Sequence, residues 1–280
     1  MTGVVLALGA ALGWGIADFL AGSTSRRVSA VVVLAASQGL GFAIVAVAAL
    51  VAGLKEPAPI DLVYAAGSGL ALTLGLGTLY RAMAVGAMAL VTPIAATGAV
   101  IPIAFGLATG DRPSTLQGVG VAAAIVGVTV ASHQRNPADA SDGGFARGVG
   151  LALLAAVGSG LTATLLAAAS SAGVLWVLLV QRATVGAVAL LIVVRLGHSM
   201  GFSRATVPAI AAIGAMDLAA TGLFTLAFTY SELSLVAVVG ALYPVVTVLL
   251  AYLVLSERLA AYQVAGVLAS LAGVAAIAGG

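Results

Sequence analysis

The stretch that decides the fold is GVVLALGAALGWG at residues 3–15, which recurs in altered form as GVGLALLAAVGSG at residues 148–160. About nine of the thirteen positions are identical at an offset of 145. A second pair, DRPSTLQ at 111–117 and ERLAAYQ at 257–263, repeats at an offset of 146, so the register barely drifts. Self-similarity at such a long period indicates internal duplication. The sequence therefore predicts two related halves.

Composition places both halves in a membrane. Of the 280 residues, 62% are hydrophobic and 7% are charged, whereas roughly 25% of the residues in a soluble domain are charged. A soluble monomer is excluded. A transmembrane helix needs about 20 apolar residues, so the chain has room for about ten spans, and we predict an all-α integral membrane protein.

Charged residues, prolines and small polar residues break the apolar sequence into ten expected spans. A longer polar stretch near the middle of the chain, 133–146, is interpreted as a linker between repeat 1–132 and repeat 147–280. The acid–arginine pairs at 111–112 and 257–258 are expected to cap the helices that follow. The expected spans are 3–21, 30–53, 60–80, 87–108, 114–132, 147–169, 174–195, 206–229, 234–255 and 260–279.

An odd number of spans has a geometric consequence. A unit of five spans ends on the opposite side of the membrane from its start, so the second copy is threaded upside down. We therefore predict ten transmembrane helices as two inverted five-helix repeats. Such an arrangement creates a pathway at the interface of the halves that opens to either side, which is alternating access.

Several function classes are excluded by what the sequence lacks. It has no cysteine and two histidines, so disulfides, thiolate metal sites and histidine-rich metal sites are not expected. The basic residues are scattered singly, unlike a nucleic-acid footprint. Ionisable residues are too few and too dispersed for a catalytic cluster, and no glycine string has the context of a nucleotide-binding loop. We expect no catalytic residues, metal or cofactor.

Two ionisable residues lie well inside expected spans. Asp217 falls midway along 206–229, and Arg182 about a third of the way into 174–195. A charge within hydrocarbon costs about 2.5 to 3.5 kcal/mol unless it has a partner. We predict that the two side chains approach each other. The pair either ties two helices together permanently or exchanges its partner for substrate or a proton.

A second polar face belongs to the first span. Trp14 and Asp18 are spaced i and i+4, so they share one helical face and form a candidate cavity wall. The alternative is that Asp18 is hydrated near the interface and Trp14 belongs to the aromatic belt. At the same register the second repeat has Ser159 and Ala163, so a cavity lined by both faces is chemically asymmetric.

Other polar residues and prolines complete the candidates. Gln38 and Gln181 lie at neighbouring positions of the repeat, where an amide bridges helices or contacts a ligand. Proline frees a backbone carbonyl, so Pro93 and Pro244 are expected to kink their spans, as hinges or as static bends. The expected substrate-cavity residues are Trp14, Asp18, Gln38, Tyr80, Thr92, Ser159, Arg182, Asp217 and Tyr243.

Three motifs carry a family resemblance: the WG pair at 14–15, RAMAVG at 81–86, and LYPVVTVLLA followed by SERL within 242–259. With them the sequence resembles the EamA-type members of the drug/metabolite transporter superfamily over essentially its whole length. Asp111 departs from the glutamate usual in the family. The resemblance implies a ten-helix carrier of small metabolites in a bacterial inner membrane, with a central cavity between the halves.

Orientation stays open, because two lines of evidence disagree. Most basic residues fall in the connections after the odd-numbered spans, so the positive-inside rule favours both termini outside. The family resemblance implies both termini inside.

The resulting hypothesis is a secondary transporter, and more specifically an exporter, of small metabolites, with proton coupling through Asp217 or Asp18 as one option. Its partners are then a small solute, protons and the lipid bilayer, and it acts as a monomer or homodimer. The alternative is a structural or regulatory membrane protein that transports nothing. The inverted duplication has no evident use in that alternative.

Overall fold

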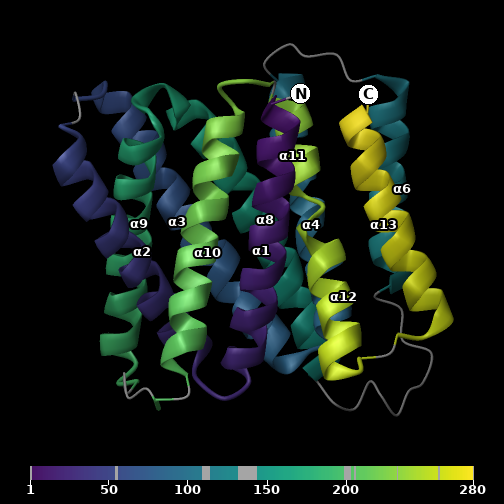
Figure 1. The fold of residues 1–280 in the computed structure, drawn as a ribbon. Helices are drawn as coiled ribbons and strands as arrows, with labels where there is room; N and C mark the ends of the chain where they lie inside the picture. Colours follow the sequence, from purple (N-terminus) through teal and green to yellow (C-terminus); the bar gives the residue numbers. More distant parts are fainter. Residues whose placement is uncertain are drawn as a thin grey trace.

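The computed structural model describes residues 2–53, 56–108, 114–131, 144–198, 203–204, 206–231, 233–257 and 259–279. Every regular element within these ranges is a helix. The helices stand roughly side by side as an upright bundle (Figure 1). The all-α prediction is therefore confirmed for the described part of the chain.

Six helices are long and apolar enough to cross a bilayer. They contain 21 to 27 residues, which at about 1.5 Å per residue exceeds the roughly 30 Å of hydrocarbon. The chain is thus a multi-pass membrane protein. These helices are α1 (Thr2–Ser25), α2 (Ala30–Ala52), α3 (Pro59–Val85), α8 (Gly144–Ala169), α9 (Val174–Arg195) and α10 (Val207–Ala227).

The fourth and ninth expected spans are discontinuous. In place of one helix over 87–108, α4 (Met88–Ala96) leads through the 3-10 turn η1 (Thr97–Ala99) into α5 (Val100–Ala108). In place of one helix over 234–255, α11 (Leu233–Gly240) is followed by α12 (Tyr243–Leu255). Corresponding positions of the two halves therefore carry broken helices.

The prolines do not lie at the breaks themselves. Pro93 is inside α4, four residues before η1 begins. Pro244 lies in the first turn of α12, after the break. This position suits proline because its missing N–H has no intrahelical partner there. The sequence predicted kinks at Pro93 and Pro244. The structure instead has helix interruptions that lie a few residues away from each proline.

The remaining helices are α6 (Thr115–Ala131), α13 (Ala261–Gly279) and the short turn η2 (Ser170–Ala172). The predicted linker 133–146 lies outside the described residues except for its last three, which already belong to α8. Helix α8 therefore begins before the predicted start of the second repeat at 147.

Helices from opposite halves of the sequence pack most extensively against each other. The four largest interfaces pair α3 with α8, α6 with α13, α1 with α10, and α2 with α9. The two ends of the chain lie at the same end of the bundle (Figure 1). The buried core mixes residues of both halves, from Phe19 and Leu34 to Val185 and Ile213. The halves are thus interlocked.

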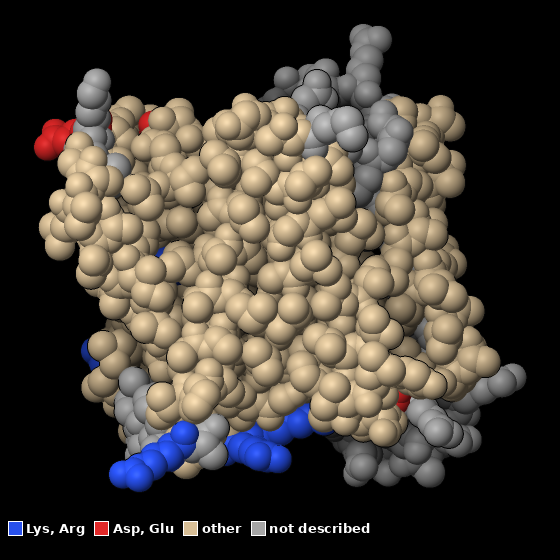
Figure 2. Space-filling view, viewed as in Figure 1, with Lys and Arg blue, Asp and Glu red and all other residues tan. Residues whose placement is uncertain are grey.

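On the face of the bundle seen in Figure 2, charged side chains lie mainly at the two ends. In the view of Figure 2 the middle of the surface carries almost no charged side chains, and the basic ones gather at the end opposite the two termini. Described arginines adjoin the helix ends there: Arg26 and Arg27 after α1, Arg81 in the last turns of α3, and Arg195 at the end of α9. We call this the arginine-rich end.

Glycines allow some helices to cross at close range. A Cβ placed on Gly214 of α10 would lie 2.5 Å from the carbonyl oxygen of Ser37 in α2. In contrast, a Cβ on Gly186 of α9 would meet nothing within 4 Å. Within a bilayer the hydrophobic effect does not drive helices together. Small residues at such crossings therefore stabilise the bundle by letting the backbones approach closely.

We predict that Gly214→Ala destabilises the protein, because α2 and α10 must separate to admit a methyl group. Overpacking costs about 1 to 3 kcal/mol, and each 1 kcal/mol lowers Tm by roughly 2 to 4 °C for a chain of comparable size. Thermal unfolding in detergent measures the shift. Gly186→Ala is the control and should leave Tm unchanged or slightly raised; an equal loss in both variants would contradict the close crossing.

Candidate functional site

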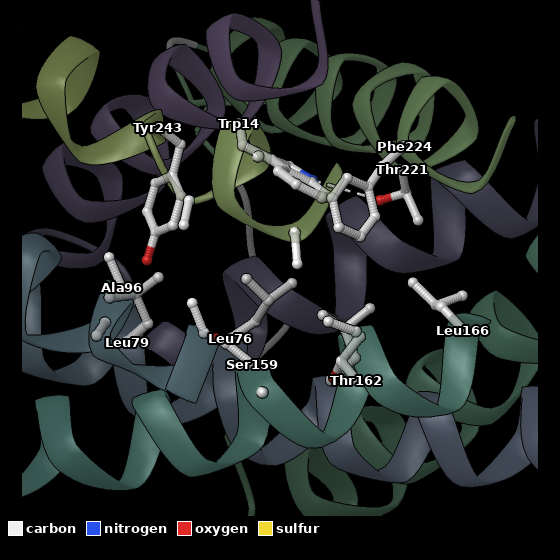
Figure 3. A pocket seen from close by; sticks show the side chains of 18 of the residues that line it. Trp14, Leu76, Leu79, Ala96, Ser159, Thr162, Leu166, Thr221, Phe224 and Tyr243 are labelled. Atoms are coloured by element: carbon white, nitrogen blue, oxygen red, sulfur yellow. Dashed lines mark hydrogen bonds between the residues drawn. The ribbon is translucent and has the colours of Figure 1, made fainter. Parts of the chain in front are cut away.

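A cavity lies between the two halves of the chain, with about 800 Å³ of empty space including its open mouth. Helices α1, α3, α4 and α5 line it from the first half, and α8 to α12 from the second. Figure 3 shows Trp14, Tyr243 and Phe224 on one wall, facing Leu76, Ser159 and Thr162 across the space. Most of the lining is apolar.

A buried charge cluster lies behind one wall of the cavity. Arg182 on α9 donates through Nη1 to the Asp217 carboxylate on α10, at 2.6 Å. Gln38 on α2 bonds to both: its Oε1 accepts from Arg182, and its Nε2 donates to Asp217 at 2.9 Å. The Arg182 and Asp217 side chains are 1% and 4% exposed. The predicted approach of Arg182 and Asp217 is confirmed.

Thr221 links this cluster to the aromatic wall. Its hydroxyl oxygen accepts from Arg182 Nη2 at 2.6 Å and from the Trp14 indole Nε1 at 3.4 Å. The indole also packs against Phe224, with ring centroids 4.8 Å apart and planes tilted by 59°. Hydrogen bond and ring contact together fix the orientation of Trp14 toward the cavity.

Three polar side chains line the cavity without a hydrogen-bond partner among the described residues. They are Asp18, Ser159 and Tyr243. Asp18 is only 5% exposed, and the Tyr243 hydroxyl points into the space (Figure 3). The Thr162 hydroxyl, in contrast, donates to the Gly158 carbonyl. The three unused groups are therefore available to a solute.

The structure does not bring all the expected cavity residues to the cavity surface. Trp14, Asp18, Ser159, Asp217 and Tyr243 line it. The others are buried elsewhere: Gln38 and Arg182 in the charge cluster, Tyr80 in the core, and Thr92 with its hydroxyl donating to the Met88 carbonyl.

Gln181, weighed as helix glue or ligand contact, does line the cavity. Its Nε2 donates to Ser68 Oγ of α3 at 3.2 Å, so this amide also bridges two helices.

Sequence analysis missed Thr221 and Phe224. A signal was available, because residues 217, 221 and 224 follow one another at helical spacing and so share a face with Asp217. Threonine and phenylalanine are, however, common in apolar helices. Nothing in the sequence shows that Arg182 and Trp14, 39 and 207 residues away from Thr221, meet at its hydroxyl.

A second ion pair joins the halves at the arginine-rich end. Arg26 Nη2 lies 2.5 Å from Glu257 Oε1, and Glu257 Oε2 accepts from the backbone N–H of Ala89 at 3.2 Å. Glu257 therefore binds the first turn of α4, as a carboxylate at a helix N-terminus does. The expectation that Glu257 caps the helix following it is wrong, since the connection between α12 and α13 carries it to another helix.

The layers between this ion pair and the cavity are tightly packed. On α3, Tyr80 and Met83 follow the last lining residue, and both are fully buried. On α4, Met88 lies before the lining residues and is also fully buried. These three buried side chains therefore pack on the side of the cavity toward the arginine-rich end.

No cluster of three or more His, Asp or Glu side chains suited to a metal ion occurs among the described residues. The cavity lining contains two acidic residues, Asp18 and Asp217, and Asp217 is already bonded to Arg182. What the site offers chemically is recognition by charge, aromatic surface and hydroxyl groups.

Comparison with known proteins agrees with the fold. The model of the EamA-like transporter family matches residues 1–132 and again residues 146–279. The chain therefore belongs to the EamA-like transporter family, as its motifs indicated. Sixteen chains of solved structures match it. One crystal structure superposes with a TM-score of 0.70 at 19% identity, covering 99% of this chain and 96% of that chain. At this identity the likeness shows the fold alone.

A search of curated proteins gives no match. The family supports a membrane transporter of the drug/metabolite type.

We predict that Arg182→Gln and Asp217→Asn each destabilise the protein strongly, because each leaves one buried charge uncompensated. Breaking a buried pair in this way costs about 3 to 5 kcal/mol. The double variant should lose much less than the sum of the two single losses. Thermal unfolding of all four proteins in detergent gives the coupling free energy.

Asp61→Asn serves as the control. Asp61 is also a buried carboxylate, but among the described residues it accepts only from the Ser171 hydroxyl, and an asparagine oxygen still accepts that bond. Strictly additive losses for Arg182→Gln and Asp217→Asn would contradict a direct pair.

Proposed function

We propose that the protein is a secondary transporter that moves small metabolites by alternating access through the cavity between its halves. The observation that carries this proposal is the cavity itself. Nine helices of both halves line it, and it holds unused polar groups beside a buried charge cluster. Transport in the exporting direction across a bacterial inner membrane, with protons as coupling ion, follows the family resemblance and the acids Asp18 and Asp217.

We further propose ten transmembrane segments arranged as two inverted repeats. If α1, α2, α3 and α6 correspond to α8, α9, α10 and α13, then exchanging the halves turns the α1–α10 interface into the α8–α3 interface. The same exchange leaves α2–α9 and α6–α13 unchanged. The four largest interfaces thus have the pattern expected of a two-fold axis, and five spans per half would place that axis in the membrane plane.

The broken helices support the same proposal. Each half contributes one interrupted segment at the corresponding place, α4–η1–α5 and α11–α12, and residues at both interruptions, Ala99 and Ala241, line the cavity. Interrupted helices in corresponding positions of inverted repeats typically mark the substrate site, because freed backbone groups can face a cavity. They also supply joints that can bend.

The Arg26–Glu257 pair is proposed as a latch of the arginine-rich end. It connects the turn after α1 to the connection before α13 and to the first turn of α4. The side chains are 34% and 14% exposed, so solvent screens the pair and its contribution is only about 1 kcal/mol or less. A latch of this strength can close one end of the pathway and still open readily.

A structural or regulatory role without transport is the competing proposal. The cavity favours transport, because a purely structural bundle gains nothing from unpartnered polar groups such as Asp18, Ser159 and Tyr243 in its interior.

Transport is tested in proteoliposomes loaded with a mixture of amino acids, amines, sugars and nucleosides, with efflux followed by mass spectrometry. We predict release of at least one class, and a loss of about tenfold or more in Ser159→Trp, whose indole fills the cavity. Leu161→Trp on the exposed face of α8 is the matched control and should transport normally.

The same vesicles are measured with and without a pH gradient. A gradient that changes the efflux rate supports proton coupling, and an unchanged rate removes it. Equal efflux from empty vesicles and protein-containing vesicles for every class would overturn the transport proposal.

The latch is tested by labelling, which the absence of native cysteine makes specific. In Met88→Cys, the thiol is buried behind the Arg26–Glu257 pair. We predict that adding Glu257→Gln raises the rate of labelling by a membrane-impermeant maleimide up to about fivefold, since about 1 kcal/mol of closure is lost.

Arg26→Gln should produce the same increase, because it removes the other partner. Glu56→Gln, a change at an exposed glutamate outside this network, should have no effect. A labelling rate that ignores both Glu257→Gln and Arg26→Gln would exclude the latch.

A further inference from the structure

The charge of the cavity lining is unbalanced. Two carboxylates, Asp18 and Asp217, belong to the lining, whereas no lysine, arginine or histidine does. Arg182 lies behind the wall and neutralises Asp217 by a direct ion pair. Among the described residues, the Asp18 carboxyl group is therefore left without a cationic partner.

The Asp18 carboxylate also lacks other means of stabilisation. It is 5% exposed, and none of the described residues donates a hydrogen bond to it. Burial of an unpaired carboxylate is costly, and its cost falls when a cation or a proton neutralises it. A positively charged ligand in the cavity would provide that neutralisation, whereas an anionic ligand would add repulsion.

Aromatic groups surround the space next to Asp18. Trp14 lies one helical turn away on the same face of α1, and its indole is held by Thr221 and Phe224. Tyr243 projects into the cavity from α12, which packs against α1 (Figure 3). The faces of tryptophan and tyrosine attract cations, and most strongly when both are desolvated.

The rest of the lining suits the apolar part of such a ligand. The facing wall is built from Leu72, Leu76, Leu166 and small residues of α4 and α8. Its unused hydroxyl, Ser159, lies opposite the aromatic wall (Figure 3). A ligand with a cationic head toward Asp18 and an apolar body toward these leucines satisfies both sides.

We infer that the substrate class is the organic cation: a small amphipathic molecule with one ammonium group, bound by the Asp18 carboxylate and the face of Trp14. This inference rests on the proposed transport function and specifies the solute for the same cavity. Selectivity comes from charge, since neutral and anionic molecules of the same size lack the pairing with Asp18.

Binding is tested on the full chain in detergent with three probes of equal aromatic group and different charge: benzyltrimethylammonium, benzyl alcohol and benzoate. The chain has two tryptophans, so Trp176→Phe leaves Trp14 as the only indole, and its fluorescence reports binding at the site. We expect benzyltrimethylammonium to bind more tightly than either other probe.

Asp18→Asn should raise the Kd of benzyltrimethylammonium by about tenfold or more, which corresponds to about 1.4 kcal/mol. The Kd of benzyl alcohol should change by less than about twofold. Asp18→Glu keeps the carboxylate and should keep the preference for the cation. Asp61→Asn, a buried carboxylate outside the cavity lining, is the matched control and should leave all three affinities unchanged.

The outcomes separate this inference from the transport proposal. Cation binding that depends on Asp18, together with no efflux of benzyltrimethylammonium or of any other solute class from proteoliposomes, upholds the organic cation as the ligand of the cavity and contradicts transport. Efflux of neutral or anionic solutes that is blocked by Ser159→Trp, without any preference for the cation in binding, upholds transport and overturns the inference. An Asp18→Asn variant that melts normally and binds all three probes as before also overturns it.

Discussion

The interaction on which the rest of the structure depends is the guanidinium of Arg182 in a water-poor interior. It draws the Asp217 carboxylate, the Gln38 amide and the Thr221 hydroxyl to one point. These groups come from α2, α9 and α10, and Thr221 extends the network to Trp14 of α1. A buried charge must be paired and hydrogen-bonded to be tolerated, so the positions of four helices from both halves are coupled to one side chain.

Around this charge cluster the helices pack closely at some positions and leave a cavity at others. Close crossings, such as the one at Gly214, bring backbones together and close the interior. The helix interruptions at Thr97–Ala99 and after Gly240 border the cavity, since Ala99 and Ala241 line it. Since interrupted backbone within a membrane needs a protein or water surface to satisfy its polar groups, the breaks and the cavity occur together. The buried side chains of Tyr80, Met83 and Met88 pack on the side toward the arginine-rich end.

The site is less symmetric than its scaffold. In the proposed two-fold arrangement the interfaces of α1 with α10 and of α3 with α8 correspond to each other, but the residues facing the cavity differ between the halves. Trp14 and Asp18 of α1 have Ser159 and Ala163 as counterparts on α8. One wall is acidic and aromatic and the other is small and nearly apolar. For the proposed carrier, this difference between the walls favours a single orientation of a bound solute.

The sequence by itself determined the class of the fold. The lengths of the apolar segments and the scarcity of charge are set by the bilayer, and these features and the repeated motifs can all be recognised along the chain. The sequence also predicted the Arg182–Asp217 pair, since two charges inside apolar spans need each other. Tertiary structure alone decided that Gln38, Thr221 and Trp14 join that pair. It also decided that Glu257 binds Arg26 and α4 instead of the helix that follows it. The positions of the interruptions in the fourth and ninth spans, a few residues from the prolines, were likewise visible only in the structure. These features depend on contacts between residues far apart in the chain, and spacing along one helix contains no information about which helix lies opposite.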